Sequence, residues 1–312
     1  MRILMSGSSG MVGRVLSQNL FRDGYEPFAL LRHTSHAPSK GLPRPGGGWL
    51  KWDPYSDQPM ENPAGLEGFD AAIHLSGENL SAGRWTSARK QAFRESRVIP
   101  TRALAALLAG RAEKPKALVC ASATGWYGDR GDELLTEDSA SGVGYLPELC
   151  RDWESASGEA ERAGIRVVHL RFGVILSREG GALKKMLPIF RAGLGGRLGS
   201  GRQWMSWATL DDVVAAIRFV MEEPSLSGPV NVCSPHPVTN AEFTRAMGAV
   251  LHRPTLFPAP GFALRMLFGE MADATILSSA RVVPQRLAEA GFRFQHPLLP
   301  EALQSVLREQ AG

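Results

Sequence analysis

The chain opens with a short apolar strand that leads through a glycine-rich turn into a helix. Residues 2–6 have the length and hydrophobicity of a strand, and residues 11–22 have helical periodicity. Gly7, Gly10 and Gly13 stand at three-residue intervals across the junction. Gly7 permits a sharp turn, Gly10 lets the backbone approach a pyrophosphate without a clashing Cβ, and Gly13 lets the helix pack closely. Because the start of such a helix binds anions, the pattern predicts a dinucleotide site, with glycines that serve only the turn as the alternative.

Strand-length apolar runs alternate with helical segments through most of the chain. The expected strands are residues 2–6, 27–32, 71–76, 117–122, 166–170 and 229–233, and the expected helices are residues 11–22, 87–108, 149–163 and 211–223. This alternation predicts an α/β fold, a doubly wound parallel sheet of the Rossmann type with helices on both faces. The unbroken hydrophobicity of the strands agrees, because parallel strands are buried on both sides.

The composition of the chain changes after Arg171. Glycine becomes denser, as in RAGLGGRLGSG at residues 191–201, and the helical segments become shorter. We expect residues 1–175, with residues 205–234 returning to them, to form the nucleotide-binding domain. Residues 176–204 and 235–312 are expected to form a smaller, mainly helical C-terminal lobe on the substrate side.

Charge, cysteine content and hydropathy exclude several classes of protein. The formal net charge is +4 and the basic residues are dispersed, so we expect no nucleic-acid partner. The three cysteines are widely spaced and form no CxxC pair, which argues against a disulfide scaffold and against a metal site. No apolar run is long enough to span a bilayer, and the first residues lack the core of a secretory signal. We therefore expect a cytoplasmic protein without membrane contact, a monomer or homodimer.

The end of the strand predicted at residues 27–32 distinguishes between the two nicotinamide dinucleotides. An enzyme that uses NAD places Asp or Glu there to bond the ribose 2′-hydroxyl, whereas this chain has Arg32 and no acid in residues 30–36. A guanidinium favours the 2′-phosphate of NADP(H), because a hydrogen bond between charged groups contributes about 1.5–3 kcal/mol. His33 can contribute a further contact to the 2′-phosphate. The alternative is that Arg32 is a solvated strand end.

Blocks of sequence that run nearly from end to end carry a family resemblance. They are GSSGMVG at residues 7–13, HLSGENL at 74–80, SRVIPTRAL at 96–104, SATGWYGDRGDE at 122–133, CRDWE at 150–154, LRFGVILSREGGAL at 170–183, GLGGRLGSGRQWMSW at 193–207, NVCSPHPVTNAEF at 231–243 and VVPQRLAEAGFRF at 282–294. The chain thus resembles the extended short-chain dehydrogenases/reductases, and among them the atypical, YfcH-like proteins of the NAD-dependent epimerase/dehydratase family. The resemblance implies a Rossmann domain, NADP(H) as cofactor and a cleft that faces the smaller lobe.

The resemblance also implies which residues contact the cofactor. The glycine turn would hold the pyrophosphate, Arg32 the 2′-phosphate, and Ser122 would face the nicotinamide. The expected contacts are Gly7, Ser8, Gly10, Met11, Val12, Gly13, Arg32, His33, Leu75, Ser76, Arg97 and Ser122.

The usual catalytic pair of this superfamily is missing. Its reductases pair a proton-donating tyrosine with a lysine four residues later, which lowers the tyrosine pKa. None of the four tyrosines of this chain is followed by such a lysine. When CRDWE is matched to the usual helix, Leu146 takes the tyrosine position and Cys150 the lysine position. Ala123 occupies the position of the Ser or Thr whose hydroxyl normally polarises the substrate. Only its neighbours Ser122 and Thr124 have a side-chain hydroxyl.

Other residues are candidates for catalysis, each with a structural alternative. Tyr127 follows the strand predicted at residues 117–122, where ligands meet open α/β sheets, and otherwise packs as an aromatic turn residue. Glu78 and Asn79 follow the strand at residues 71–76, and otherwise cap their loop. We take Ser122, Tyr127 and Glu78 as the catalytic candidates. Tyr145 lies in the wrong helical register.

Residues of the later loops are candidates for the substrate cleft. They are Arg171, Gln203, Trp204 and Trp207, with packing at a core boundary as the alternative for the tryptophans.

Two functions follow from this pattern. One is an NADP(H)-dependent oxidoreductase or epimerase that acts on a small polar, nucleotide-sugar-like substrate with a non-standard active site. The other is a catalytically inactive NADP(H)-binding regulator or scaffold, which the absence of the Tyr–Lys pair favours.

Overall fold

A seven-stranded parallel sheet forms the centre of the computed structural model, which describes residues 1–32, 48–81 and 83–308. The strands lie in the order β11 (Gly228–Val232), β7 (Arg166–Phe172), β5 (Ala117–Ala123), β4 (Ala71–His74), β1 (Arg2–Ser6), β2 (Glu26–Leu31) and β3 (Trp49–Lys51). Each strand pairs with its neighbours in parallel. The strand order reverses between β1 and β4, and ligands of open α/β sheets bind outside the carboxyl ends of the strands at such a point. The predicted fold class is confirmed.

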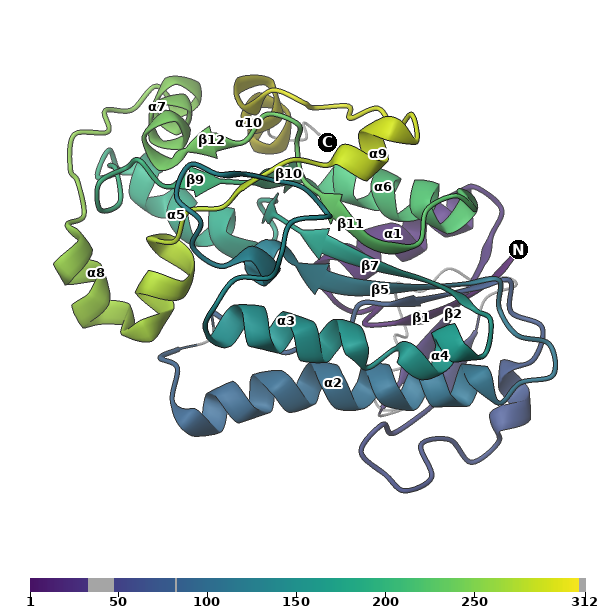
Figure 1. Ribbon diagram of the computed structural model, residues 1–312. Coiled ribbons are helices and arrows are strands. Elements are labelled where there is room, and N and C mark those ends of the chain that lie inside the picture. Colours follow the sequence, from purple (N-terminus) through teal and green to yellow (C-terminus); the bar gives the residue numbers. More distant parts are fainter. Residues whose placement is uncertain (33–47, 82, 309–312) are drawn as a thin grey trace.

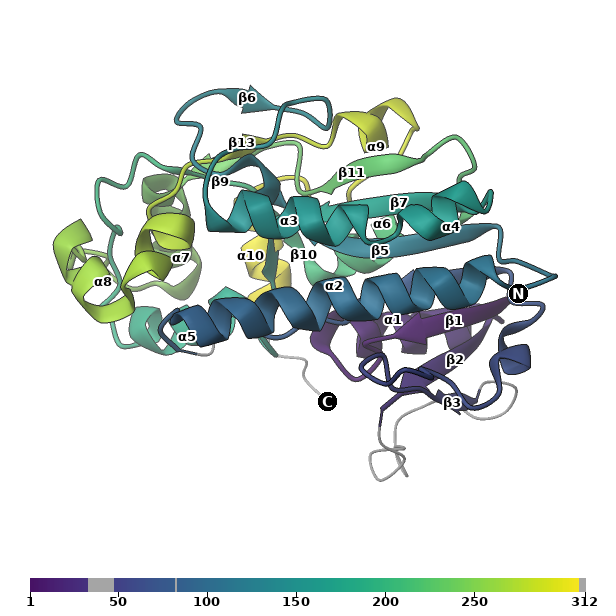
Figure 2. The same ribbon diagram turned by 60° about the horizontal axis from the view of Figure 1, so that its bottom comes forward.

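Helices cover both faces of this sheet (Figures 1 and 2). On one face, α1 (Met11–Arg22), α6 (Leu210–Glu222) and the short α9 (Gln285–Glu289) pack against Ile3 and Met5 of β1 and against equivalent residues of the other strands. On the other face, α2 (Ser87–Ala109) and α4 (Gly158–Arg162) pack against Leu4 and its neighbours. Alternate residues of each strand therefore enter two separate cores, as the unbroken apolar runs predict.

The helix predicted at residues 149–163 consists of two helices. α3 (Tyr145–Ser155) begins earlier than expected, and α4 starts only at Gly158. Between them the buried Ser157 hydroxyl donates to the carbonyl of Glu154 at 2.9 Å and lies 2.8 Å from Nε2 of His169 on β7. A serine side chain that bonds in this way competes with the helical backbone pattern, and it holds the chain to the sheet at the break.

Several short elements carried no detectable pattern in the sequence. They are the strand β3, the paired segments β6 (Leu134–Leu135), β8 (Val174–Leu176), β9 (Trp204–Met205), β10 (Trp207–Thr209), β12 (Val238–Thr239) and β13 (Arg281–Val282), and the 3₁₀ turns η2 (Pro63–Leu66) and η3 (Thr124–Tyr127). Runs of two to four residues are too short for periodicity to separate them from loops.

The later part of the chain adds a third apolar cluster beside the sheet. α5 (Gly181–Arg191), α7 (Asn240–Leu251) and α10 (Leu299–Leu307) pack around Trp207 and Phe243. α8 (Gly261–Phe268) and the π-helical turn η4 (Ala272–Ile276), at the left of Figure 1, instead pack in another apolar cluster with Trp85 and Phe93. α9, which we assigned to the smaller lobe, instead buries Leu287 in the core of the sheet. The division of the chain into two domains otherwise stays a prediction.

Candidate functional site

The turn between β1 and α1 can be made only with glycine at two of its three glycine positions. Gly7 has a φ of +72°, and a Cβ there would lie 2.7 Å from the carbonyl carbon of Leu75, the residue after β4. A Cβ on Gly13 would lie 2.2 Å from the carbonyl oxygen of Gly7. Because Gly13 has no side chain, α1 packs closely against the glycine turn. Because Gly7 has none, the turn lies directly against the end of β4.

The N-terminus of α1 is open to an anion. Its N-cap is Gly10, which has no side chain to cap the helix, and its first turn carries no acidic residue. The N–H groups of residues 11–13 have no acceptor within the helix, so they are free for a ligand. Ser8 is buried, Val12 is half-buried, and the sulfur of Met11 lies against Gly180, where a Cβ would come within 2.7 Å of it. This end of the helix fits the pyrophosphate of a dinucleotide.

Arg32 lies on the surface directly after β2. Its guanidinium carbon stands 6.0 Å from the ring centroid of Tyr55, in the loop that follows β3. Because β1, β2 and β4 are parallel, Arg32 is at the same edge of the sheet as the glycine turn, where the 2′-phosphate of a dinucleotide would lie. His33, the other predicted contact to that phosphate, is outside the described residues.

The loop after β4 forms the second wall of the site and is held by a buried arginine. Leu75 and Ser76 are half-buried, and Leu75 N–H continues the sheet by donating to the Ser6 carbonyl at 3.1 Å. Arg97 of α2 donates to the carbonyls of Glu78 at 2.8 Å and Phe93 at 3.0 Å. Its guanidinium is packed so closely under the loop that a Cβ on Gly77 would come within 3.3 Å of it. Arg97 thus fixes the position of the loop, and its predicted contact to the cofactor stays a prediction.

Ser122 belongs to a buried ionic network at the carboxyl end of β5. Its hydroxyl donates to a carboxylate oxygen of Glu154 at 2.6 Å. Arg171 on β7 donates to both oxygens of the same carboxylate, at 2.9 Å each. All three residues are less than a tenth exposed. With its hydroxyl used in this network, Ser122 is poorly placed for the catalytic role that we considered, and Arg171 is a core residue rather than part of a substrate cleft.

Tyr127 is also part of this interior network. Its side chain is fully buried, its hydroxyl donates to the Asn231 side-chain oxygen at 2.7 Å, and Arg171 donates to that hydroxyl at 3.1 Å. Burial raises the pKa of Tyr127 to about 12, although Arg171 opposes the shift. A phenol that is buried, bonded on both sides and hard to ionise does not serve as a proton donor to a ligand. The packing alternative for Tyr127 is the one that this geometry supports.

Apolar packing fills the positions where the usual tyrosine and lysine would stand. Leu146 and Cys150 of α3 both lie against Gly125, where a Cβ would come within 3.5 Å and 3.7 Å of them. The Cys150 thiol is 3.8 Å from the carbonyl of Ala123, and burial raises its pKa to about 12. The thiol is therefore protonated near neutral pH and is no nucleophile.

Glu78 is the catalytic candidate that remains accessible. Its side chain is 39% exposed and pairs with Arg89 of α2 at 3.1 Å, while its backbone N–H donates to the Ser96 hydroxyl at 3.2 Å. The neighbouring Asn79 accepts from both the N–H and the hydroxyl of Ser81, so it caps its loop, as the structural alternative holds. Glu78 thus presents an accessible carboxylate from within the loop after β4.

The later part of the chain touches this loop from the opposite side. Lys185 of α5 donates to the Ser81 carbonyl at 2.8 Å, and Arg84 donates to the carbonyl of Met266 in α8 at 2.6 Å. Lys90 pairs with Glu270 at 2.9 Å. These contacts hold α5 and α8 against the loop that follows β4. The cleft expected between the glycine turn and the later segments stays a prediction.

The other predicted cleft residues bond to neighbouring protein groups. Gln203 donates to the carbonyls of Leu198 and Ile276, and Trp207 is fully buried and donates to the His236 carbonyl. Trp204 donates to Asp132. The hydroxyl of Tyr145 donates to the Lys90 carbonyl of α2 at 2.7 Å.

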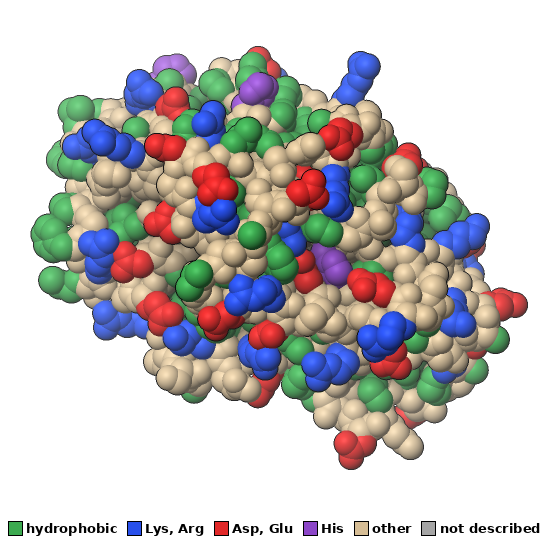
Figure 3. Space-filling model, in the orientation of Figure 1, with side chains coloured by type: hydrophobic (Ala, Val, Ile, Leu, Met, Phe, Trp, Pro, Cys, Tyr) green, Lys and Arg blue, Asp and Glu red, His purple; other side chains and the backbone are tan. Residues whose placement is uncertain are grey.

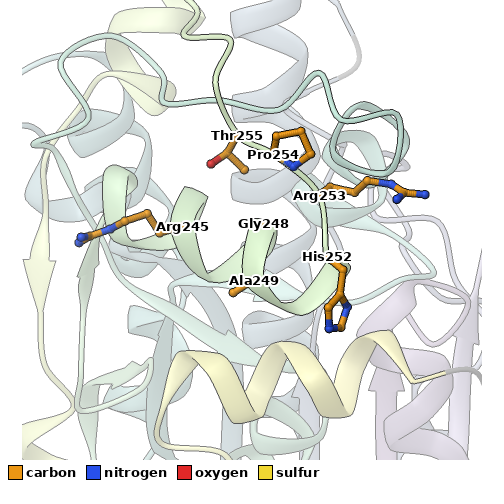
Figure 4. Close-up of a pocket in the computed structure, with 7 residues that line it drawn as sticks. All are labelled: Arg245, Gly248, Ala249, His252, Arg253, Pro254 and Thr255. Carbon is orange, nitrogen blue, oxygen red and sulfur yellow. The ribbon is translucent and has the colours of Figure 1, made fainter.

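A surface hollow of about 540 Å³ lies far from the glycine turn in the fold, at the C-terminal end of α7. Figure 4 shows the residues that line it, among which Arg245 and Arg253 point away from each other. None of the predicted site residues lines it. On the face drawn in Figure 3, basic and acidic side chains are interspersed over the surface.

The described residues offer neither a metal site nor a membrane-spanning helix. Within residues 1–32, 48–81 and 83–308, no three His, Cys, Asp or Glu side chains are grouped so as to hold a metal ion. No helix in those same segments is both long and apolar enough to cross a membrane.

Comparison with known proteins identifies the family. The sequence profile of the NAD dependent epimerase/dehydratase family matches residues 3–233. This chain belongs to that family. A second profile, a domain of unknown function (DUF1731), matches residues 259–306 of this epimerase-family chain. The predicted resemblance, including the C-terminal part, is confirmed.

Relatives of this epimerase-family chain match over nearly its full length. The Mycobacterium tuberculosis epimerase family protein MT2273 is 42% identical and the match covers 96% of each chain, while YfhF of Bacillus subtilis is 35% identical over 99% of each. A crystal structure of human epimerase family protein SDR39U1 with NADPH superimposes with a TM-score of 0.85 at 30% identity, covering 98% of this chain and 99% of that one.

Proposed function

We propose that this epimerase-family protein binds NADP(H) and is an oxidoreductase or epimerase for a small polar substrate, such as a nucleotide-linked sugar. The observation that carries the cofactor assignment is the glycine turn, closed against β4 and leading into an uncapped helix, with Arg32 at the same edge of the sheet. That a human relative was crystallised with NADPH supports the choice of the phosphorylated dinucleotide.

Each part of the site would have a separate task. The N–H groups at the start of α1 hold the pyrophosphate, and Arg32 neutralises the 2′-phosphate. Arg97 keeps the loop after β4 against the cofactor by bonding to the Glu78 carbonyl. Bound NADP(H) supplies or accepts a hydride at its nicotinamide ring. The residues of the chain then have to bind the substrate and transfer one proton to or from it.

Glu78 is the residue that we propose for the proton. A half-exposed carboxylate beside the cofactor wall can accept a proton from a substrate hydroxyl, and its ion pair with Arg89 orients it. Replacing Glu78 with glutamine keeps its size but removes the base. We expect turnover to fall by a factor of about 10²–10⁴ while NADPH binding is unchanged.

A specific observation also favours a second function, an NADP(H)-binding regulator or scaffold without catalysis. Leu146 and Cys150 fill the positions of the usual tyrosine and lysine with apolar packing against Gly125. A chain with this arrangement can keep the cofactor site while lacking the standard proton relay.

The cofactor assignment is tested by titrating the purified chain with NADPH and with NADH. We expect NADPH to bind more tightly, and the substitution Arg32→Ala to remove about 10- to 100-fold of that preference, because it removes a charge-assisted hydrogen bond. Equal binding of both dinucleotides before the substitution would rule the assignment out.

Turnover separates the two functions. The panel pairs carbonyl compounds with NADPH, which can reduce them, and nucleotide sugars with NADP⁺, which can oxidise their hydroxyl groups. Loss or formation of the reduced cofactor and the appearance of an epimer are followed. Tight binding of NADPH without any turnover on the panel favours the regulator.

A further inference from the structure

Most of the large apolar side chains exposed on the described surface belong to two segments of the later chain. Of thirteen such residues in the described ranges, seven lie within residues 189–194 and 256–267, and each of these is 52–78% exposed. Three are on α8: Phe262, Met266 and Leu267. The other four, at the end of α5 and before α8, are Ile189, Leu194, Leu256 and Phe257. We call these seven residues the apolar patch. Exposed apolar side chains are normally scattered singly, and a group of them marks an interaction surface.

Backbone hydrogen bonds hold the two segments of the apolar patch together. The N–H of Phe257 donates to the Gly195 carbonyl at 3.4 Å, and the N–H of Ala259 donates to the Arg197 carbonyl at 2.9 Å. α8 follows directly, and Leu264 is its one buried residue. Figure 1 shows α8 at the left end of the molecule, and Figure 3 shows apolar side chains along that edge with Lys and Arg beside them.

The same part of the chain carries a concentrated positive charge. Residues 180–210 and 243–269, which include the whole patch, contain eight Lys and Arg residues and no Asp or Glu. Because the net charge of the chain is +4, all other residues together have a net charge of −4. All eight basic residues are exposed.

This positive charge is largely unneutralised. Within the described part of the chain, seven of the eight basic residues form no ion pair, and the eighth, Arg265, pairs with Asp273 at 2.8 Å. The other acid that follows α8, Glu270, is already paired with Lys90 of α2. An anionic surface can therefore approach the patch without meeting a free carboxylate from these residues.

Apolar side chains surrounded by basic ones fit a surface that is both apolar and anionic. A second copy of this chain is disfavoured, because it would bring eight further positive charges against the same face. A bilayer with anionic headgroups offers acyl chains to the phenylalanines and phosphates to the arginines. The patch side chains project from a short helix and from the segment before it. A fluid bilayer takes up projecting side chains without a preformed pocket, which a folded protein partner would have to supply.

We propose that the apolar patch docks this protein on an anionic lipid bilayer. Phe257, Phe262 and Met266 enter the bilayer at the level of the headgroups. Arg197 and Arg253, which lie in the same two segments, contact the lipid phosphates. We expected no membrane contact because the chain has no apolar run that could span a bilayer, but docking on the surface needs no spanning segment.

The test is sedimentation of the full chain with lipid vesicles of two compositions. One is phosphatidylcholine alone, and the other is an equal mixture of phosphatidylcholine and phosphatidylglycerol, which is anionic. The chain should sediment with the anionic vesicles at physiological salt and bind the neutral ones much more weakly. Binding to the anionic vesicles should weaken in 1 M salt, where charges are screened beyond about 3 Å.

Two double variants separate the apolar from the charged contribution. Phe257→Ser with Phe262→Ser should weaken binding to the anionic vesicles by about 10- to 100-fold, because two large apolar side chains no longer leave water. Arg197→Gln with Arg253→Gln should weaken it by about 25-fold, since each basic residue near an anionic surface contributes about fivefold.

A matched control replaces exposed apolar residues outside the two segments. Leu134 and Val143 are 53% and 96% exposed, so Leu134→Ser with Val143→Ser should leave vesicle binding unchanged. Melting followed by circular dichroism shows whether each variant is folded. If the phenylalanine variant does not fold, the arginine variant and the salt series still test the proposal.

Three outcomes would overturn the proposal. Absence of binding to the anionic vesicles would rule out the bilayer and leave an acidic protein as the occupant of the patch. Full binding by a folded phenylalanine variant would show that the patch is not the contact. Equal weakening by the phenylalanine variant and the control variant would show the same.

Discussion

Removing the charge of Arg171 should destabilise the fold strongly. Its guanidinium makes two 2.9 Å bonds to Glu154 and one of 3.1 Å to Tyr127, and the two side chains of the ion pair are 3% and 9% exposed. Arg171→Met keeps much of the side chain's length but leaves a buried carboxylate without a counterion. Losing one partner of a buried pair costs about 3–5 kcal/mol. At roughly 2 °C per kcal/mol for a chain of this size, the melting temperature should fall by about 6–10 °C.

A surface pair provides the matched control for this measurement. Arg94 and Asp152 form an ion pair at 2.8 Å, but their side chains are 47% and 39% exposed. Arg94→Met makes the same chemical change on the surface and should cost about 0–1 kcal/mol.

A double variant tests whether the effect comes from the unpaired charge. Because Arg171→Met combined with Glu154→Leu removes both charges, the double variant should recover a large part of the loss. Melting is followed by circular dichroism at neutral pH for all of these variants. The reasoning is wrong if Arg171→Met and Arg94→Met lower the melting temperature equally, or if the double variant is no more stable than Arg171→Met.

Three further predictions concern single sites. Gly13→Ala should destabilise the fold by about 1–3 kcal/mol, because its Cβ would lie 2.2 Å from the Gly7 carbonyl oxygen. The control is Gly65→Ala, whose Cβ would come no closer than 3.7 Å to another residue. Denaturant titration of both variants should show the smaller loss of stability for Gly65→Ala. Thr239→Ala removes the capping box of α7 and should cost about 1 kcal/mol, while Thr239→Ser should retain most of it, and equal losses would contradict the capping role. Burial raises the pKa of the Glu137 carboxyl in the folded chain. Folding is therefore favoured while this carboxyl is protonated, and that contribution to stability is lost as the pH rises above the ordinary value of about 4.5. Glu137→Gln should therefore gain in melting temperature relative to the parent between pH 4 and 7, and parallel pH curves would contradict this.

Features set by neighbouring residues could be predicted from the sequence. The turn at Gly7, the helix Met11–Arg22 and the run of buried strands follow from local pattern, and the bounds of α1 agree with the prediction. Arg32 was located because the end of the second strand is a fixed position in this fold. The fold class required no more than these local signals and their alternation.

Contacts between distant residues could not be predicted in the same way. Tyr127 looked like a catalytic candidate because it follows a strand, but its partner Asn231 is 104 positions away along the chain. The ion pair of Glu154 and Arg171 joins a helix to a strand and leaves no periodic signal. Tyr55 follows a strand of only three residues, which the sequence pattern did not indicate. Side chains of this kind acquire their roles only when the sheet brings them together.

The position of β11 at one edge of the sheet has a consequence for how the protein is synthesised. A nascent chain that stops before residue 228 leaves the hydrogen-bonding groups of β7 open along that edge. One that stops before residue 285 leaves the apolar surface that Leu287 covers bare to solvent. Open strand edges and bare apolar surfaces make incomplete chains aggregate. The sheet is therefore fully covered only after Leu287 has been synthesised, and copies that end earlier should be removed by chaperones and proteases.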